Sequence, residues 1–264
     1  MKKRLDLILL ERGLFPSREQ ARTAIMTGRV LIKGEKQTKA GTPVDVEAKI
    51  DIIGEDKPFV SRGGLKLDKA VRQYNLELSG KTVMDIGAST GGFTDCALQN
   101  GAAKVYAVDV GYGQLAWSLR NDERVVVLEK TNARYLTMEQ VPESVDVITI
   151  DASFISLKKL IPNLIAFLKP QGRFVVLIKP QFEAGREKVG KKGVVRDPAT
   201  HVEVITDLLL FFVQQGLKAE ALTYSPVRGP EGNREYLAIL SHGSREPDLA
   251  SVPALVDEAF KVVN

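Results

Sequence analysis

From about residue 60 onward, short apolar runs alternate with longer amphipathic runs, and this alternation limits the possible folds more than any other feature. The apolar runs predict strands at 82–86, 104–109, 125–128, 145–151, 173–179, 218–225 and 236–241. The amphipathic runs predict helices at 64–74, 93–100, 114–120, 157–168, 199–215 and 252–263. Strands that alternate with helices form a doubly wound, mostly parallel α/β sheet. The last two strands lie close enough in the chain to pair antiparallel.

The first 56 residues have a different pattern, which predicts a small separate α+β domain. Leu5, Ile8 and Leu9 share one helical face, and Ser17 is placed to cap a second helix. Strands are expected at 30–32 and within 44–53, with a tight turn at 33–35. Asp56-Lys57-Pro58 is short, polar and helix-breaking, so we expect a linker at 57–60 and a second domain from 61 to 264.

Charge is concentrated in the N-terminal segment. Residues 1–40 hold ten Lys and Arg against four Asp and Glu, a net +6, so the rest of the chain sums to −2 within the overall +4. This favours contact with a polyanion at that end, although a solvated basic surface has the same composition.

The composition also excludes several classes of protein. A single cysteine, Cys96, rules out a disulfide framework and a Cys-rich zinc site, and we assign no metal site. The N-terminal apolar run at 7–10 is too short for a signal peptide, and no run is long enough to span a bilayer. A cytoplasmic protein without membrane contact is expected.

A glycine-rich loop follows the first predicted strand of the sheet. Its pattern, D-x-G-x-x-x-G-G from Asp85 to Gly92, differs from the G-x-G-x-x-G of dinucleotide sites and brings an acidic residue into the loop. Asp109 ends the next strand, where a carboxylate can accept both hydroxyls of a ribose, and Asn132 follows the third strand. The three features together favour a nucleoside ligand with a cationic amino-acid part over a solvated turn.

These elements resemble the binding motifs of Rossmann-like class I methyltransferases, which implies S-adenosylmethionine as cofactor. Carried over by position, the cofactor-binding residues would be Asp85, Gly87, Ala88, Ser89, Gly91, Gly92, Phe93, Asp109, Asn132 and Asp151.

Charged residues also stand at the ends of the later strands. Asp151 and Lys179 each follow an apolar strand, Glu235 precedes one, and Lys66 lies on the helix before the sheet. One such residue alone is usually a surface group. Methyl transfer to a ribose hydroxyl requires alignment and removal of a proton, and a lysine can act as base only where its ammonium is made less stable.

The four residues resemble the K-D-K-E tetrad of FtsJ/RrmJ-type ribose 2′-O-methyltransferases. The resemblance makes Lys179 the main base or hydroxyl-orienting group and has Asp151 set its charge state. Lys66 and Glu235 would position the ribose and its phosphate. The N/D-P-P-Y motif of base methyltransferases is absent after the fourth strand, where the chain reads DASF.

A closer resemblance covers nearly the whole chain. The runs SRGGLKL, GASTGGFTD, DVGYGQLAWSLRND, DASFISL, KPQFEAGR and GPEGNREY are similar to those of the TlyA family, whose members are called hemolysin A or rRNA 2′-O-methyltransferase. This implies 2′-O-methylation of cytidine in ribosomal RNA, with rRNA or ribosomal subunits as partners. The N-terminal pattern resembles the S-four (S4) RNA-binding domain, and the candidates for phosphate contact are Arg4, Arg18, Arg22 and Lys33.

Several alternatives stay open. The hemolysin name allows a membrane-active protein, and the fold could be kept by a non-catalytic RNA-binding assembly factor. The Gly- and Lys-rich loop at 185–196 could close over RNA or be a solvated loop. Trp117 is expected to pack in the core, and His201 and His242 lack metal-ligand spacing and receive no role.

Overall fold

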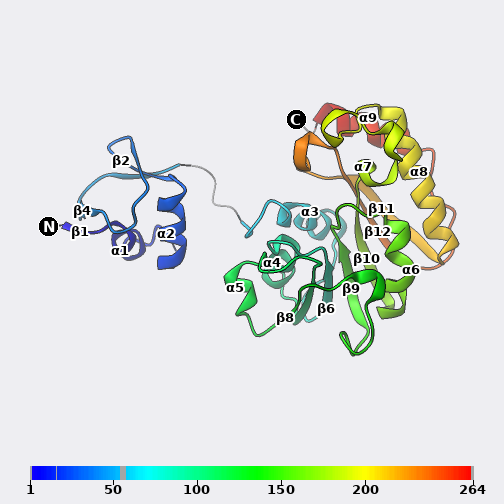
Figure 1. Cartoon of the computed structure of the whole chain (residues 1–264), viewed down its shortest axis with the longest axis horizontal. Helices are drawn as coiled ribbons and strands as arrows, with labels where there is room; N and C mark the ends of the chain where they lie inside the picture. Colours follow the sequence, from blue (N-terminus) through cyan, green and yellow to red (C-terminus); the bar gives the residue numbers. More distant parts are fainter. Residues whose placement is uncertain (1, 16, 54–57, 263–264) are drawn as a thin grey trace. The chain divides into compact units, whose positions relative to one another are not determined.

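The computed structural model describes residues 2–15, 17–53 and 58–262, which form two compact units, Met1–Asp56 and Lys57–Asn264 (Figure 1). Asp56 and Lys57, on which the predicted linker depends, lie outside the described residues, so the linker stays a prediction. Each unit is built around its own apolar core.

The N-terminal unit combines two helices with two small antiparallel sheets. Its elements are β1 (Lys2–Arg4), α1 (Leu5–Glu11), α2 (Arg18–Met26), β2 (Val30–Ile32), β3 (Glu35–Gln37), β4 (Pro43–Asp45) and β5 (Ile50–Ile52). β1 pairs with β4, and β2 lies between β3 and β5. The Ser17 side chain accepts the Gln20 N–H, which confirms the predicted helix cap. Lys33 and Gly34, both with positive φ, make the predicted turn between β2 and β3.

Within residues 58–262 a seven-stranded sheet has the order β11-β12-β10-β9-β6-β7-β8. Its strands are β6 (Thr82–Ile86), β7 (Lys104–Val108), β8 (Val125–Leu128), β9 (Val145–Ile150), β10 (Leu168–Ile178), β11 (Leu217–Tyr224) and β12 (Tyr236–His242). β6 to β10 are parallel, whereas β12 runs antiparallel to both of its neighbours, β10 and β11. The mostly parallel sheet with an antiparallel last strand is confirmed.

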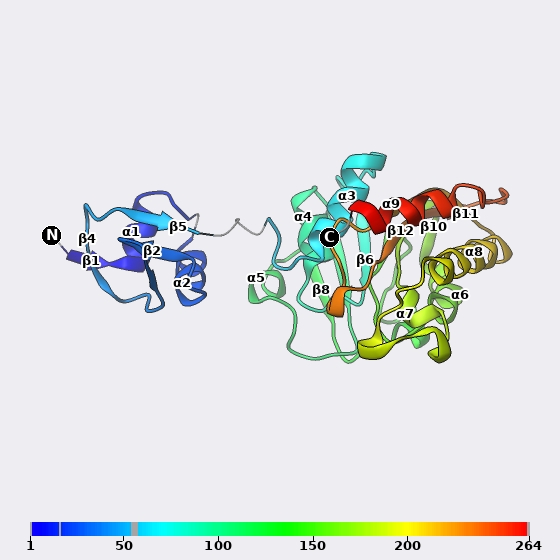
Figure 2. The ribbon, with the colours of Figure 1, turned by 90° about the horizontal axis from the view of Figure 1, so that it is seen from above.

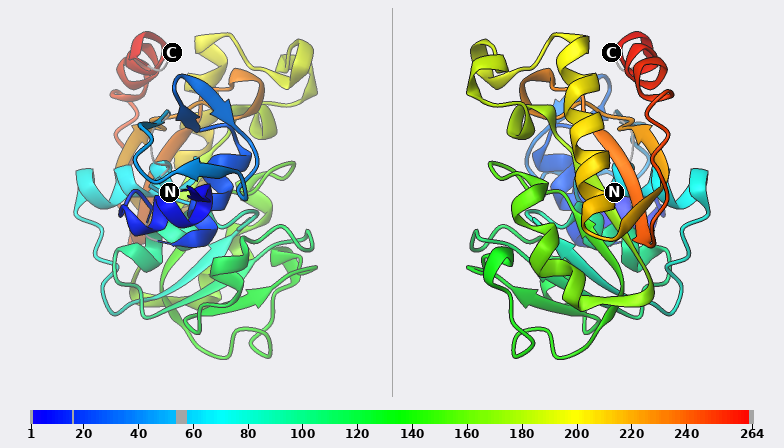
Figure 3. Two further views of the ribbon diagram at one scale, coloured as in Figure 1. Left: turned by 90° about the vertical axis from the view of Figure 1, so that its left-hand side faces the viewer. Right: turned by 90° about the vertical axis from the view of Figure 1, so that its right-hand side faces the viewer.

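Helices cover both faces of this sheet (Figures 1 and 2). α3 (Gly64–Tyr74), α4 (Gly92–Gln99) and α5 (Trp117–Arg120) share one apolar cluster with the sheet. α6 (Ile161–Leu164), α8 (Pro198–Gln214) and α9 (Val252–Val262) share the other, and Figure 3, right, shows α8 lying over the sheet. A short helix, α7 (Pro180–Glu183), follows β10 directly. None of the helices in the described part of the chain is long and apolar enough to cross a membrane.

Two predicted helices differ from the structure. The segment expected to be helical at 157–168 is divided into a 3₁₀ turn at Leu157–Lys159, α6, and a second 3₁₀ turn at Ile165–Phe167. Pro162 lies in the first turn of α6, where its missing N–H and fixed φ begin a new helix instead of continuing an old one. The helix expected at 114–120 contains only α5, and Trp117, expected in the core, is 67% exposed.

Candidate active site

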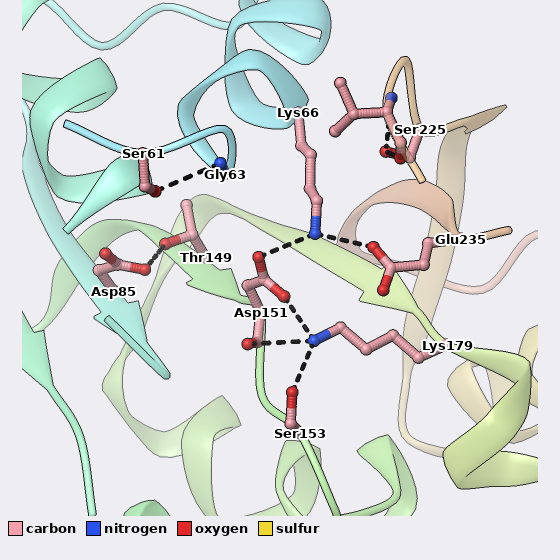
Figure 4. Close-up of polar contacts among 11 residues, drawn as sticks. Ser61, Gly63, Lys66, Asp85, Thr149, Asp151, Ser153, Lys179, Ser225 and Glu235 are labelled. Atoms are coloured by element: carbon pink, nitrogen blue, oxygen red, sulfur yellow. Dashed lines mark hydrogen bonds and ion pairs between the residues drawn. The ribbon is translucent and has the colours of Figure 1, made fainter. Parts of the chain in front are cut away.

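Charged residues meet at the edge of the sheet where the parallel strands end (Figure 4). Asp151 directly follows β9 and Lys179 directly follows β10. Glu235 precedes β12, and because β12 is antiparallel its beginning lies at the same edge, where Tyr236 pairs with Ile178 of β10. Lys66 reaches this edge from the first turn of α3.

The four side chains form one continuous set of ion pairs. Lys179 Nζ lies 2.6 Å from Asp151 Oδ1, and Lys66 Nζ lies 3.2 Å from Asp151 Oδ2 and 2.7 Å from Glu235 Oε2. Asp151 therefore bridges the two lysines with one oxygen each. Lys179 also donates to Ser153 Oγ at 3.0 Å, a contact that sequence reasoning missed. The structure thus brings together all four residues expected from the sequence.

The set is almost withdrawn from solvent. The side chains of Lys66, Lys179 and Glu235 are 9%, 7% and 0% exposed, and that of Asp151 is 18% exposed. Burial alone would lower the pKa of Lys66, but the carboxylates of Asp151 and Glu235 outweigh it, so the pKa of Lys66 is raised. Lys66 consequently stays an ammonium ion and cannot serve as a base at neutral pH.

Gly229 makes room for the carboxylate of Glu235. A Cβ at Gly229 would overlap the Glu235 carboxylate, so only glycine lets the chain before β12 pass so close. Glu235 Oε1 is buried and has no hydrogen-bond partner in the described structure. The run GPEGNREY contains Gly229, but sequence alone did not reveal its role because the close approach is tertiary.

The glycine-rich loop connects β6 to α4 as expected. Asp85, which was expected to bind the cofactor, is buried in β6 and does not line the cavity described below. Asp85 is 1% exposed and accepts hydrogen bonds from Thr94 Oγ1 at 2.7 Å and Thr149 Oγ1 at 2.9 Å. Burial raises the pKa of Asp85 to about 6, because its two partners are neutral hydroxyls. Asp85 therefore ties β6 to α4 and β9.

A cavity of about 350 Å³ opens beside the loop. Of the residues expected to bind a cofactor, it is lined by Gly87, Ser89, Asp109, Asn132 and Asp151. The other five, Asp85, Ala88, Gly91, Gly92 and Phe93, are not among the lining residues; they form the loop and its junction with α4. Gln114 and Phe154, which sequence reasoning missed, also line it.

The cavity suits an adenosyl group. Asp109 accepts the N–H groups of Ser89 at 2.8 Å and Gly111 at 2.6 Å, and a carboxylate so held has further lone pairs for two ribose hydroxyls. Apolar side chains of Ile86, Val108, Ala133 and Leu160 supply walls for a base. A Cβ at Gly87 would come within 2.8 Å of the Asp151 carbonyl oxygen, so the loop approaches the end of β9 closely.

A second cavity, of about 390 Å³, lies at the opposite edge of the sheet. It is lined by residues at the starts of β6 and β9 and before the parallel part of β10, including Lys81, Asp146 and Lys169. None of the residues expected to bind the cofactor or to catalyse the reaction line it.

In the N-terminal unit, two of the four expected RNA contacts share one buried acid. Arg4 donates through Nε and Nη2 to Asp6 at 3.0 and 3.1 Å, and Arg18 donates through Nε to Asp6 at 3.0 Å. Asp6 is 0% exposed, whereas the two arginine side chains are 50% and 49% exposed. Arg22 is exposed one turn beyond Arg18 on α2, and Lys33 is exposed at the β2–β3 turn.

Comparison with known proteins identifies both units. The family model described as FtsJ-like methyltransferase matches residues 59–242, and the S4 domain model matches residues 3–50.

Relatives resemble the whole chain. YqxC of Bacillus subtilis is 46% identical over 99% of this chain and 95% of that protein. The 16S/23S rRNA (cytidine-2′-O)-methyltransferase TlyA of Mycobacterium tuberculosis is 44% identical over 88% of this chain and 87% of that protein. A solved structure from Streptococcus thermophilus, which carries the name hemolysin, is 43% identical with a TM-score of 0.77 and covers 98% of this chain and 96% of that chain.

Proposed function

The chain belongs to the FtsJ-like methyltransferase family, and on this basis we propose that it methylates the 2′-hydroxyl of a cytidine in ribosomal RNA. It is an enzyme that depends on S-adenosylmethionine, whose sulfonium supplies an activated methyl group. The cavity residues Gly87, Asp109 and Asn132 would hold the adenosyl part. A ribosomal substrate implies that the enzyme works in the cytoplasm.

Lys179 is the residue that we assign to the acceptor hydroxyl. Its Nζ contacts Asp151 and Ser153, and both of these residues line the cavity. When bound, S-adenosylmethionine would supply the methyl carbon, and its sulfur would keep the electron pair of the broken carbon–sulfur bond. Lys179 would orient the ribose 2′-hydroxyl; once its ammonium has lost a proton to solvent, its neutral amine would take the O2′ proton as the bond from O2′ to the methyl carbon forms.

Lys66 has a different part in this step. Because Asp151 and Glu235 hold it charged, it compensates both carboxylates and fixes the oxygen of Asp151 that faces away from Lys179. Asp151 then has one oxygen left for Lys179, which sets the orientation of that lysine. We therefore propose that Lys66 and Glu235 place the two reacting groups and take no proton themselves.

The N-terminal unit is the proposed RNA anchor. It carries an S4 domain, and Arg4, Arg18, Arg22 and Lys33 all present charge to solvent. Such residues bind phosphates without reading sequence, so recognition would depend on RNA shape. Ribosomal RNA, alone or in an assembled subunit, is the partner that we propose.

One observation carries the proposal: the Lys66–Asp151–Lys179–Glu235 set lies beside a cavity suited to an adenosyl group. The test is to incubate the enzyme with labelled S-adenosylmethionine and rRNA or subunits from a strain lacking it, and to map the product by mass spectrometry. Label on a cytidine ribose is expected; label on a base, or none on any RNA, would contradict the proposal. Absence of S-adenosylmethionine binding in calorimetry would favour the non-catalytic RNA-binding alternative.

A further inference from the structure

A basic loop at residues 185–196 follows α7, only a few residues after Lys179. It contains five Lys and Arg residues and one Glu, and all five cations are exposed: Arg186, Lys188, Lys191, Lys192 and Arg196. Lys188 is paired with Glu203 on α8. Val194 and Val195 are in contrast 8% and 3% exposed, so the loop has a buried end and a charged tip.

One buried amide holds the loop. Asn233, 4% exposed, donates from Nδ2 to the Gly193 carbonyl oxygen at 2.9 Å and accepts the Val195 N–H at Oδ1, at 3.3 Å. The side chain thereby satisfies a donor and an acceptor of the loop backbone, as a neighbouring strand would. Asn233 stands two residues before Glu235, so the loop is joined to the start of β12.

A buried histidine makes a second connection. His201, 0% exposed on α8, contacts the Val195 carbonyl oxygen through Nε2 and the Tyr236 hydroxyl through Nδ1, both at 2.9 Å. A carbonyl oxygen only accepts, so Nε2 carries the hydrogen and Nδ1 accepts from Tyr236. Asn233 therefore holds the loop directly before Glu235, and His201 links it to Tyr236 after Glu235.

The tip of the loop has a shape that needs such support. Lys192, with φ of 63°, adopts the left-handed conformation that side chains other than glycine rarely keep. It precedes Gly193, whose carbonyl Asn233 holds. A strained residue persists where its surroundings determine it, which indicates a loop of defined form.

We propose that the basic loop is a preformed contact surface for the phosphates of the RNA strand that carries the target nucleotide, and that Asn233 and His201 are the positioning residues that fix it to β12. The proposal rests on the proposed function and adds an RNA contact in the methyltransferase unit. Lys191 and Lys192 supply the charge, and the hydrogen bonds of Asn233 to Gly193 and Val195 join the loop to the segment just before Glu235.

The first experiment replaces the charged tip with Lys191→Ala/Lys192→Ala. We expect KM for RNA to rise about tenfold or more and the slope of log affinity against log salt to fall by about 2, with kcat at saturating RNA and S-adenosylmethionine affinity unchanged. The control, Lys81→Ala/Lys169→Ala, removes the same charge at the opposite edge of the sheet and should leave KM and the slope as in the wild type.

An assay of the wild-type enzyme distinguishes failure of the proposed function from failure of the loop proposal. If it transfers no methyl group to RNA, the proposed function fails. If it does, and the tip variant keeps the wild-type KM and salt slope, the loop proposal is overturned. A rise in KM with assembled subunits but not with protein-free rRNA would also overturn it, because the partner of the loop would then be a ribosomal protein.

The second experiment tests the positioning residues with Asn233→Ala. Limited trypsin digestion followed by mass spectrometry should show new cleavage after Lys191 and Lys192, and KM for RNA should rise with little change in S-adenosylmethionine affinity. Asn233→Asp keeps the acceptor for Val195 but loses the donor to Gly193, so it should give an intermediate result and serves if the alanine variant does not fold. Wild-type protection and KM in both variants would refute the role of Asn233.

Discussion

Among the described residues, each unit contains one almost fully buried aspartate, and the two are held in opposite ways. Asp6 in the N-terminal unit accepts hydrogen bonds from the guanidinium groups of Arg4 and Arg18, and those bonds hold its pKa below the ordinary value despite burial. Asp85 in the methyltransferase unit accepts from the hydroxyls of Thr94 and Thr149, and burial raises its pKa to about 6.

The difference reflects what surrounds each acid. The cations bound to Asp6 are half exposed, so a buried anion orients charge that faces solvent and can meet a polyanion. In the methyltransferase unit the cations Lys66 and Lys179 are themselves buried, and Asp85 has no cation beside it. The N-terminal unit thus directs positive charge outward, and the methyltransferase unit holds it inside, at the proposed reaction site.

The largest expected effect comes from removing Lys179, the residue proposed to contact the reacting hydroxyl. Lys179→Met should lower kcat for methyl transfer by about a hundredfold to ten-thousandfold, the usual range for loss of a proton-transfer group, and leave RNA affinity unchanged. Lys169→Met is the matched control, because Lys169 Nζ also pairs with an aspartate, Asp146, at 2.9 Å but lies at the opposite edge. Single-turnover methyl transfer and filter binding measure both quantities; a loss smaller than tenfold would remove Lys179 from the mechanism.

The next effect concerns the stability of the methyltransferase unit. Lys66→Met leaves Asp151 and Glu235 without their shared cation, so the free energy of unfolding should fall by about 3–5 kcal/mol. Arg72→Met on the same helix breaks an exposed pair with Asp68 and should cost about 1 kcal/mol or less. Urea unfolding followed by circular dichroism compares them, and equal losses would show that burial does not distinguish the two pairs.

The two buried aspartates should give opposite dependences of stability on pH. Folded Asp85 binds its proton more tightly than the unfolded chain does, so its contribution to stability falls by about 2 kcal/mol as pH rises from 4 to 6. Asp6 has a lowered pKa, so its contribution is present above pH 4 and is lost as pH falls further.

Urea unfolding between pH 3 and 7 separates the two contributions. Asp85→Asn should flatten the slope between pH 4 and 6, and Asp6→Asn should reduce the loss below pH 4. If both variants kept the wild-type profile, the contrast between the two acids would have no energetic basis.

The smallest effect is expected for RNA binding by the N-terminal unit. Asp6→Asn removes the anion that orients Arg4 and Arg18, so KM for RNA should rise about tenfold at physiological salt while kcat stays unchanged. Glu11→Gln, which breaks the exposed pair with Lys3, is the control and should have no effect. A fall in kcat instead of a rise in KM would mean that Asp6 acts only through folding.

The fold was largely predictable because its signals are local and periodic. Apolar runs of strand length gave the order of the sheet strands along the chain, and Ser17 marked a helix start correctly. The prediction of one continuous helix at 157–168 was wrong because it gave the apolar spacing more weight than Pro162. In the structure this proline lies in the first turn of a new helix. The prediction that Trp117 packs in the core was wrong because hydrophobicity does not reveal which face of a four-residue helix meets solvent.

The site was predictable only in part. Asp151, Lys179 and Glu235 were singled out at strand ends and Lys66 on the preceding helix, a family resemblance grouped the four, and the structure brings them together. Spacing alone could not have grouped them, because Lys66 and Glu235 are 169 positions apart. The contacts made by Asp6, His201 and Asn233 depend on tertiary packing, so sequence patterns gave them no role.

The reversed direction of β12 has a consequence for how this enzyme can diversify. Lys179 follows β10 and Glu235 precedes β12, and the pairing of Ile178 with Tyr236 sets the two residues side by side. Insertions or deletions in the loop between α7 and α8 could therefore reshape the proposed RNA-contact surface while Lys179 and Glu235 stay side by side. The antiparallel pairing of β10 with β12 would thus let the RNA target change while the two charged residues keep their places.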